Sequence, residues 1–203
     1  IGGLIVDGGN FDWGKAGADR QPAMNTPDPC YGGVVWDEQV TKNMGLPFAY
    51  LLKLRTTLLR DLGGAMSPFN AWMFIQGLET LPLRMREHAK NAQAVAEALA
   101  ANKKVQSVTY PGLFEGAEKE KADKYMTGGY GALIGFELPG GKEAGSKFID
   151  SLELLYHVAN IGDSRSLAIH PATTTHSQLA PEEQLSAGVT PGYVRLSIGI
   201  ENV

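Results

Sequence analysis

The chain has 203 residues, which is enough to bury a sizeable core in one or two compact domains. Its hydrophobic and charged contents, 43% and 20%, are ordinary for a globular protein, and a net charge of −4 argues against nucleic acid as a partner. The single cysteine, Cys30, excludes an internal disulfide framework and favours a reducing, cytoplasmic compartment. We expect Cys30 to be a small buried residue, with a catalytic thiol as the alternative. Charged residues interrupt the longest helical pattern, so no membrane span is expected.

The chain begins inside an apolar segment. Gly2–Val6 predicts a buried strand, and the irregular stretch Phe11–Gly33 is long enough to predict a functional loop or an interface arm. Since the chain starts in mid-segment at Ile1 and stops just after a strand at Val203, we expect it to be part of a longer polypeptide rather than a trimmed chain.

Three helices are predicted next. Apolar residues at helical spacing predict a helix over Phe48–Leu62, which Gly63 ends. Ser67, followed by a proline, is the expected N-cap of a second helix, which is apolar on most faces and is expected to be buried. An amphipathic helix is predicted over Leu81–Ala101, with His88 on its apolar stripe as a core or interface histidine.

Strands and helices then alternate. The predicted strands are Val105–Tyr110, Ala132–Leu138, Tyr156–Asn160 and Tyr193–Glu201, and the predicted helices are Glu115–Lys124, a segment from Gly141 to near Leu154, and Pro181–Ala187. This order predicts a two-layer α/β domain that follows the end of another domain.

The most polar segment, Ala159–Leu179, predicts a loop that presents side chains to a ligand, because neither an amphipathic helix nor a half-buried strand carries polar residues so densely. His170 and His176 have no cysteine or carboxylate partner at metal spacing, so no metal site is expected. Ser166 and His170 are too close in an extended loop to face each other as nucleophile and base.

Arg195 is the strongest single candidate for binding. It lies in the alternating strand Tyr193–Glu201, on the side opposite the aliphatic residues and beside the small residues Ser197 and Gly199. An arginine in such a place is either a solvent-facing residue or a bidentate clamp for a carboxylate. The small neighbours leave room for a ligand and favour the clamp.

Five segments together resemble the cystathionine γ-synthase family, the Cys/Met-metabolism group of pyridoxal-phosphate enzymes. They are Asn25–Gly33 (NTPDPCYGG), Leu59–Ala92, Val108–Leu113 (VTYPGL), Ala159–Leu179 (ANIGDSRSLAIHPATTTHSQL) and the VRLSIGIE run that contains Arg195. Within the family, the SPFNAW and TTTHSQL runs most resemble the branch that transfers a thiol onto O-acetylhomoserine.

The resemblance implies an α/β fold of the fold type I, aspartate aminotransferase-like class. Residues 1–80 would be the end of the large cofactor domain, and residues 81–203 the two-layer α/β C-terminal domain. The cofactor would be pyridoxal 5′-phosphate, bound mainly by residues outside this segment, and the Schiff-base lysine would precede Ile1. The resemblance also implies a homotetramer whose sites are shared between subunits.

The resemblance further implies roles for individual residues. Arg195 matches the family arginine that binds the substrate α-carboxylate, and Ser166 matches the loop serine whose backbone helps to hold the same carboxylate. Arg165 departs from the family, because many relatives carry glutamate there. Arg60 and Asp61 align with a polar pair near the wall of the active site. The alternative, at a helix end, is that they only cap the helix and pair with each other.

The reaction implied is γ-replacement on O-acetyl-L-homoserine with sulfide or a thiol, which gives homocysteine or methionine plus acetate. Cystathionine γ-synthase or a methionine or cystathionine γ-lyase is the alternative within the family. From a different class, the alternative is a non-catalytic binding or assembly fragment. The sequence alone does not fix the acyl group or the thiol donor.

Overall fold

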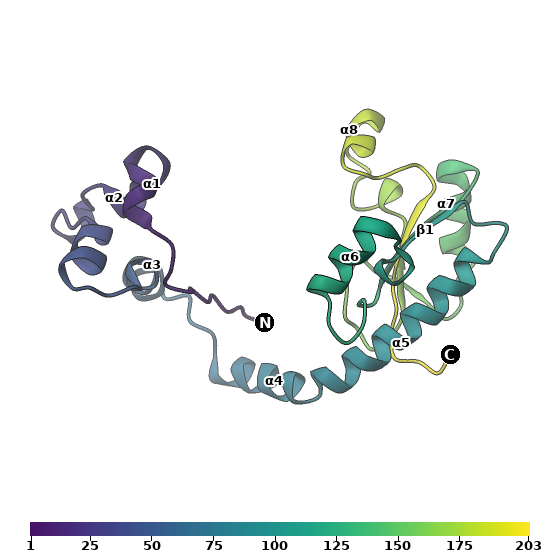
Figure 1. Cartoon of the computed structure of the whole chain (residues 1–203), viewed down its shortest axis with the longest axis horizontal. Coiled ribbons are helices and arrows are strands. Elements are labelled where there is room, and N and C mark those ends of the chain that lie inside the picture. The colour runs from purple at the N-terminus through teal and green to yellow at the C-terminus, as the bar shows by residue number, and fades with distance from the viewer. The chain divides into compact units, whose positions relative to one another are not determined.

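The computed structural model describes residues 1–203, and the chain divides into two compact units, Ile1–Gln76 and Gly77–Val203. In Figure 1 the first unit carries the purple and blue colours and the sheet-containing second unit the teal to yellow ones. None of the helices combines the length and hydrophobicity that crossing a membrane requires.

The named elements of the first unit are all helices or helical turns. Its elements are α1 (Trp13–Arg20), α2 (Pro22–Asn25), the 3-10 turn η1 (Pro29–Tyr31), the π-helix η2 (Asp37–Asn43), α3 (Ala49–Leu54), the π-helix η3 (Arg55–Arg60) and the start of α4 (Pro68–Glu79). Its small core consists of Met24, Trp36, Val40 and Ala49. The predicted helix over Phe48–Leu62 is confirmed as α3 and η3, and Gly63 follows it with a left-handed φ of 73°.

Two predictions in this unit are wrong. Gly2–Val6 forms no strand and is largely exposed, because an extended segment needs a neighbouring strand for its backbone hydrogen bonds and none pairs with it here. Helix α4 begins as predicted, with Ser67 Oγ accepting a hydrogen bond from the backbone N–H of Asn70 at 3.2 Å. Its apolar side chains are not buried, however, and Phe69 and Trp72 are both more than half exposed.

The second unit is a mixed five-stranded sheet with helices. Its elements are α5 (Leu81–Ala100), β1 (Ser107–Thr109), the 3-10 turn η4 (Pro111–Leu113), α6 (Gly116–Tyr125), β2 (Leu133–Glu137), α7 (Gly141–Asp150), β3 (Tyr156–His157), β4 (Leu167–Ile169), the 3-10 turn η5 (Pro171–Thr173), α8 (Pro181–Ser186) and β5 (Tyr193–Ser197). The strand order is β1-β2-β5-β4-β3, and all neighbours are antiparallel except β3 and β4.

One face of this sheet carries the core. The core consists of Ala92 and Ala96 of α5, Tyr110, Ile134 and Phe136 of β2, Ile149 of α7, Ala168 of β4, and Val194, Leu196 and Ile198. Helices α5 and α7 therefore both supply side chains to the face that β5 lines with aliphatic residues. The opposite face carries the other residues of β5, including Arg195, as the alternation predicted.

The structure corrects the description of Ala159–Leu179 as a loop. Its middle contains the fully buried strand β4, which pairs with β5 on one side and β3 on the other. The three apolar residues of β4 suffice for a central strand because the neighbouring strands and the helices supply the rest of its environment.

Candidate functional site

Arg195 sits in the middle of β5, paired with Gly135 of β2 on one side and Ile169 of β4 on the other. The residue is half-buried, and one Nη atom donates a hydrogen bond to the backbone oxygen of Asn160 at 3.3 Å. Its Nε is buried and has no hydrogen-bond acceptor. A planar guanidinium with a buried, unused donor can bind a carboxylate through two parallel hydrogen bonds.

The surroundings of Arg195 are shaped by a glycine and a tyrosine. Any side chain at Gly135 would collide with the ring of Tyr193, so glycine is required for this ring to lie across β2. Burial raises the pKa of the Tyr193 hydroxyl, and the charge of Arg195 opposes this effect only in part. Tyr193 is therefore a neutral neighbour, and Arg195 is the group on this face that would attract an anion.

Ser166 immediately precedes β4. It is three residues before Ile169, the residue of β4 that pairs with Arg195, so the two positions are about 10 Å apart along the strand. Its backbone N–H donates to Glu201 Oε1 at 2.5 Å, and its hydroxyl donates to Glu201 Oε2 at 2.9 Å. The hydroxyl also accepts a hydrogen bond from the N–H of Gly199 at 2.8 Å. In this structure the backbone N–H of Ser166, whose backbone was expected to help hold a substrate carboxylate, therefore binds the carboxylate of Glu201.

Glu201 is held in its ionised form. Burial alone would raise the pKa of Glu201, but the hydrogen bonds from Ser166 and the backbone, with the nearby His88, outweigh burial and lower it. A side chain at Gly199 would collide with this carboxylate and with the backbone oxygen of Ser164, so the close approach depends on glycine.

Helix α5 fixes the backbone that follows β5. His88 is 1% exposed, as the sequence predicted for a core histidine, and its Nδ1 lies 2.6 Å from the backbone oxygen of Ile198. Asn91 is 2% exposed and donates from its amide nitrogen to the backbone oxygens of Gly199 at 3.2 Å and Glu201 at 2.7 Å. Two buried polar residues of one helix thus hold the segment that carries Glu201.

A mainly apolar pocket of about 410 Å³ lies beside this segment. Its lining includes Met85, His88, Tyr130, Leu133, Ile161 and Ser197. The Nε2 of His88, which lines this pocket, is buried without a hydrogen-bond partner.

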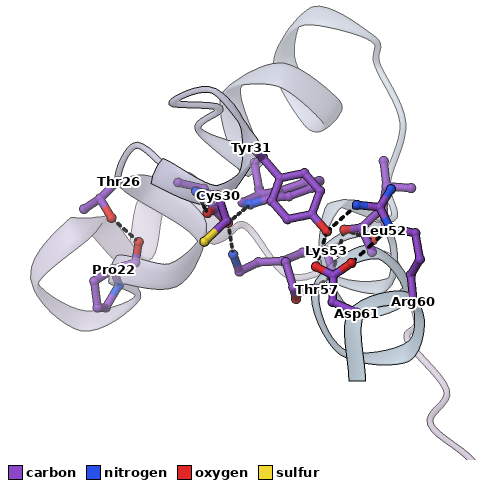
Figure 2. Close-up of polar contacts among 12 residues, drawn as sticks. Pro22, Thr26, Cys30, Tyr31, Leu52, Lys53, Thr57, Arg60 and Asp61 are labelled. Carbon is purple, nitrogen blue, oxygen red and sulfur yellow. Dashed lines mark hydrogen bonds and ion pairs between the residues drawn. The ribbon is translucent and has the colours of Figure 1, made fainter. Parts of the chain in front are cut away.

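Arg60 and Asp61 belong to the first unit, where Tyr31 joins them in a closed polar cluster (Figure 2). The Tyr31 hydroxyl donates to Asp61 Oδ2 at 2.7 Å, and Arg60 donates to Asp61 Oδ1 at 3.0 Å and to the Tyr31 hydroxyl at 2.9 Å. Burial and the bond to Asp61 raise the pKa of Tyr31, and the bonds from Tyr31 and Arg60 lower that of Asp61.

The remaining candidates are engaged elsewhere or exposed. Arg165 is exposed, pairs with Asp163 at 3.3 Å and lies over the ring of Tyr156. His170 is fully buried, and its ring nitrogens lie 2.9 Å from Thr173 Oγ1 and 2.8 Å from the backbone oxygen of Pro191, so it braces the fold. Cys30 is exposed, and the prediction that it is buried is wrong.

Sequence reasoning missed Glu201, Asn91 and Tyr31. Glu201 and Ser166 are 35 residues apart and Asn91 and Glu201 are 110 apart, so no local pattern connects them. The glutamate directly after the alternating run of Arg195 was the available signal, because a carboxylate ending an apolar strand needs a partner.

Comparisons with known proteins identify the family of the chain. Residues 1–203 match the family described as Cys/Met metabolism PLP-dependent enzyme. The chain is 52% identical, over its whole length, to O-acetyl-L-homoserine sulfhydrylase of Leptospira meyeri, and it spans 46% of that relative.

Two solved structures share the fold. A crystal structure described as an O-acetylhomoserine (thiol)-lyase of Campylobacter jejuni, with a pyridoxyl-lysine phosphate, matches with a TM-score of 0.77 and 41% identity over 91% of this chain and 42% of that one. A cystathionine γ-synthase of Xanthomonas oryzae matches with a TM-score of 0.63 and 40% identity over 70% of this chain and 36% of that one. These matches confirm the family resemblance and the predicted α/β fold class.

Proposed function

The chain belongs to the Cys/Met-metabolism family of pyridoxal-phosphate-dependent enzymes, and from this premise we propose that the whole protein carries out γ-replacement on O-acetyl-L-homoserine. Sulfide or a thiol displaces acetate, and the product is homocysteine, or methionine when methanethiol is the acceptor. The 52% identity to a protein named O-acetyl-L-homoserine sulfhydrylase supports this substrate and acceptor. The chain spans about half of that relative, so the proposal concerns the whole protein.

The observation that carries the proposal is the free guanidinium edge of Arg195. Its buried Nε without an acceptor fits the α-carboxylate of an amino acid that is held on the cofactor. Pyridoxal phosphate, when bound, supplies the electron sink for the chemistry at the amino-acid carbons. We propose that the residues of this chain serve the substrate side and that the lysine that binds the cofactor lies outside residues 1–203.

Arg195 orients the substrate in this proposal. Two parallel hydrogen bonds to the carboxylate fix both the position and the rotation of the amino acid, and strand β5 keeps the arginine itself in place between two neighbouring strands. Orientation of this kind contributes on the order of several kcal/mol to lowering a reaction barrier. Ser166 is proposed to belong with Arg195 to the carboxylate-binding side of the site, and Arg165, Arg60 and Asp61 are proposed as parts of the active-site wall in the whole protein.

The test is Arg195→Ala in the full-length protein loaded with pyridoxal phosphate. We expect kcat/KM for O-acetyl-L-homoserine to fall roughly 100-fold or more, because a buried charged partner of a carboxylate is lost. Arg195→Lys keeps the charge but not the planar fork and should recover only part of the loss. Arg86→Ala, an exposed arginine on α5, is the matched control. An unchanged kcat/KM in the alanine variant would remove Arg195 from the site.

Cystathionine γ-synthase activity is the second candidate, and the match to the Xanthomonas oryzae structure supports it. The two activities differ in the acceptor. Assays with sulfide and with cysteine as alternative acceptors separate them, and elimination without an acceptor would indicate a γ-lyase.

Three further proposals concern organisation. We propose that residues 1–80 complete the cofactor domain and that residues 81–203 form the C-terminal domain. We also propose a cytoplasmic homotetramer with sites shared between subunits. The exposed apolar side chains of α4, such as Phe69 and Trp72, support an interface there. Light scattering of the full-length protein measures the oligomeric state.

A further inference from the structure

We infer that Glu201 is a positioning residue for the carboxylate-binding arginine, and this inference rests on the proposed role of Arg195. Glu201 acts through the segment Asn160–Ser166, which lies between β3 and β4 and supplies the backbone oxygen that receives the hydrogen bond from Arg195. The chain of contacts runs from Glu201 to Ser166, along the segment to Asn160, and from Asn160 to the guanidinium.

Besides the bond from Arg195 to Asn160, four groups of hydrogen bonds join this segment to β5 and the residues after it. The Gly162 N–H donates to Ser197 Oγ at 3.3 Å, and the Ile200 N–H donates to the Ser164 backbone oxygen at 2.9 Å. Ser166 then makes two bonds to the Glu201 carboxylate and accepts one from Gly199. Glu201 supplies the only charged partner among them, and bonds to an ionised acceptor are roughly twice as strong as neutral ones.

The backbone that carries Glu201 is itself fixed from the other side. Asn91 of α5 donates to the backbone oxygens of Gly199 and Glu201, and His88 contacts the backbone oxygen of Ile198. Because α5 packs against the same sheet through Ala92 and Ala96, the segment Ile198–Glu201 has little freedom to shift. Glu201 therefore transmits the position of a rigid helix to the segment that contacts Arg195.

Loss of the Glu201 carboxylate would leave the buried Ser166 N–H without its acceptor and would release the end of the segment next to β4. Asn160 could then move, and one Nη of Arg195 would lose its fixed acceptor. The guanidinium would sample several orientations, and the first step to suffer would be binding of the amino-acid carboxylate.

The experiment uses the full-length protein with pyridoxal phosphate and compares Glu201→Ala with Glu201→Gln. We expect Glu201→Ala to raise KM for the amino-acid substrate about tenfold and to change kcat less than about threefold, the pattern of lost ground-state binding. Glu201→Gln keeps the length and one acceptor oxygen, so it should raise KM about threefold. Glu120→Gln, at an exposed position of α6, is the matched control and should leave both constants unchanged.

A double variant separates positioning from general stability. If Glu201 acts only through Arg195, then Glu201→Ala added to Arg195→Ala should change kcat/KM by less than about twofold, because the interaction it positions is already absent. A full tenfold further loss would overturn the inference and indicate a structural role. If the alanine variant does not fold, the same cycle is run with Glu201→Gln.

Hydrogen exchange of the segment 160–166 gives a readout that does not depend on activity. We expect the Ser166 amide to exchange at least about tenfold faster in Glu201→Ala than in the parent protein, and unchanged protection would overturn the inference. The outcomes also separate the two proposals. If Arg195→Ala leaves kcat/KM unchanged, the proposed role of Arg195 fails; if Arg195→Ala is impaired but Glu201→Ala is not, only the positioning role of Glu201 fails.

Discussion

Replacement of Asn91 by alanine tests whether α5 holds the end of β5. Asn91 is 2% exposed, and its amide nitrogen donates to two backbone oxygens, those of Gly199 and Glu201. Alanine keeps the helix and removes both donors. The backbone carbonyl groups of Gly199 and Glu201 then lose their hydrogen-bond donor on α5, and a small cavity replaces the amide.

The magnitude follows from these contacts. Each buried acceptor that loses its partner costs about 1–3 kcal/mol, and the shorter bond, 2.7 Å to Glu201, is expected to contribute more than the 3.2 Å bond to Gly199. The higher helix propensity of alanine returns roughly 0.5 kcal/mol. The net loss of unfolding free energy is therefore about 1.5–5.5 kcal/mol, or a fall on the order of 10 °C in Tm for a unit of this size.

The assay is urea unfolding followed by far-ultraviolet circular dichroism. Tryptophan fluorescence is unsuitable because Trp13, Trp36 and Trp72 all lie in the first unit. Lys90→Ala is the matched control, since Lys90 neighbours Asn91 on α5 but is 74% exposed and only pairs with Glu87, so a change below about 0.5 kcal/mol is expected. The reasoning is refuted if Asn91→Ala is no more destabilising than Lys90→Ala.

Two further predictions concern the two units. Hydrogen bonds from Lys53 and Trp36 lower the pKa of Asp28 below its ordinary value of 3.8, so the stabilisation it provides is complete above that value and is lost as pH falls through the lowered pKa. In melts followed by tryptophan fluorescence, Asp28→Asn should therefore lower Tm at neutral pH, and the difference from the parent should shrink below pH 3.8; a constant difference would contradict this. In the second unit, Ile134→Ala should lower the free energy of unfolding in urea by about 2–5 kcal/mol because the side chain is fully buried. Leu133→Ala, on the exposed side of β2, should lower it much less. Equal losses would contradict the assignment of the core to the face that carries Ile134.

The elements that the sequence predicted well are those with a long periodic pattern. Helix α5 was predicted from a long amphipathic pattern, and strands β2 and β5 were predicted from apolar or alternating runs with clear turn signals, and the structure places all three within a few residues of the predicted bounds. Strand β4 was missed because only three apolar residues, Leu167–Ile169, separate two polar stretches. Its strand conformation depends on β3 and β5, which local sequence does not reveal.

The candidate site divides in the same way. Arg195 could be recognised because its own strand shows which face it occupies, and its small neighbours are adjacent in sequence. The role of Glu201 could not be recognised, because its partner Ser166 comes from another strand end and the groups that fix its backbone come from α5. Long-range contacts of this kind arise only when the sheet has assembled.

The unpaired Nε of Arg195 connects the fold to the proposed function. A buried donor without an acceptor lowers the stability of the fold by about 1–3 kcal/mol. Glu201 is the carboxylate nearest to Arg195 in the sequence, but it does not accept a hydrogen bond from this donor. Glu201 binds Ser166 instead and leaves the guanidinium edge free. A carboxylate from an amino-acid substrate would supply the missing acceptor, so part of its binding energy would come from a polar group that the folded protein keeps unsatisfied. The stability of the second unit and the affinity of the site are then linked: a substitution that lets Arg195 pair within the protein should stabilise the unit and weaken substrate binding together.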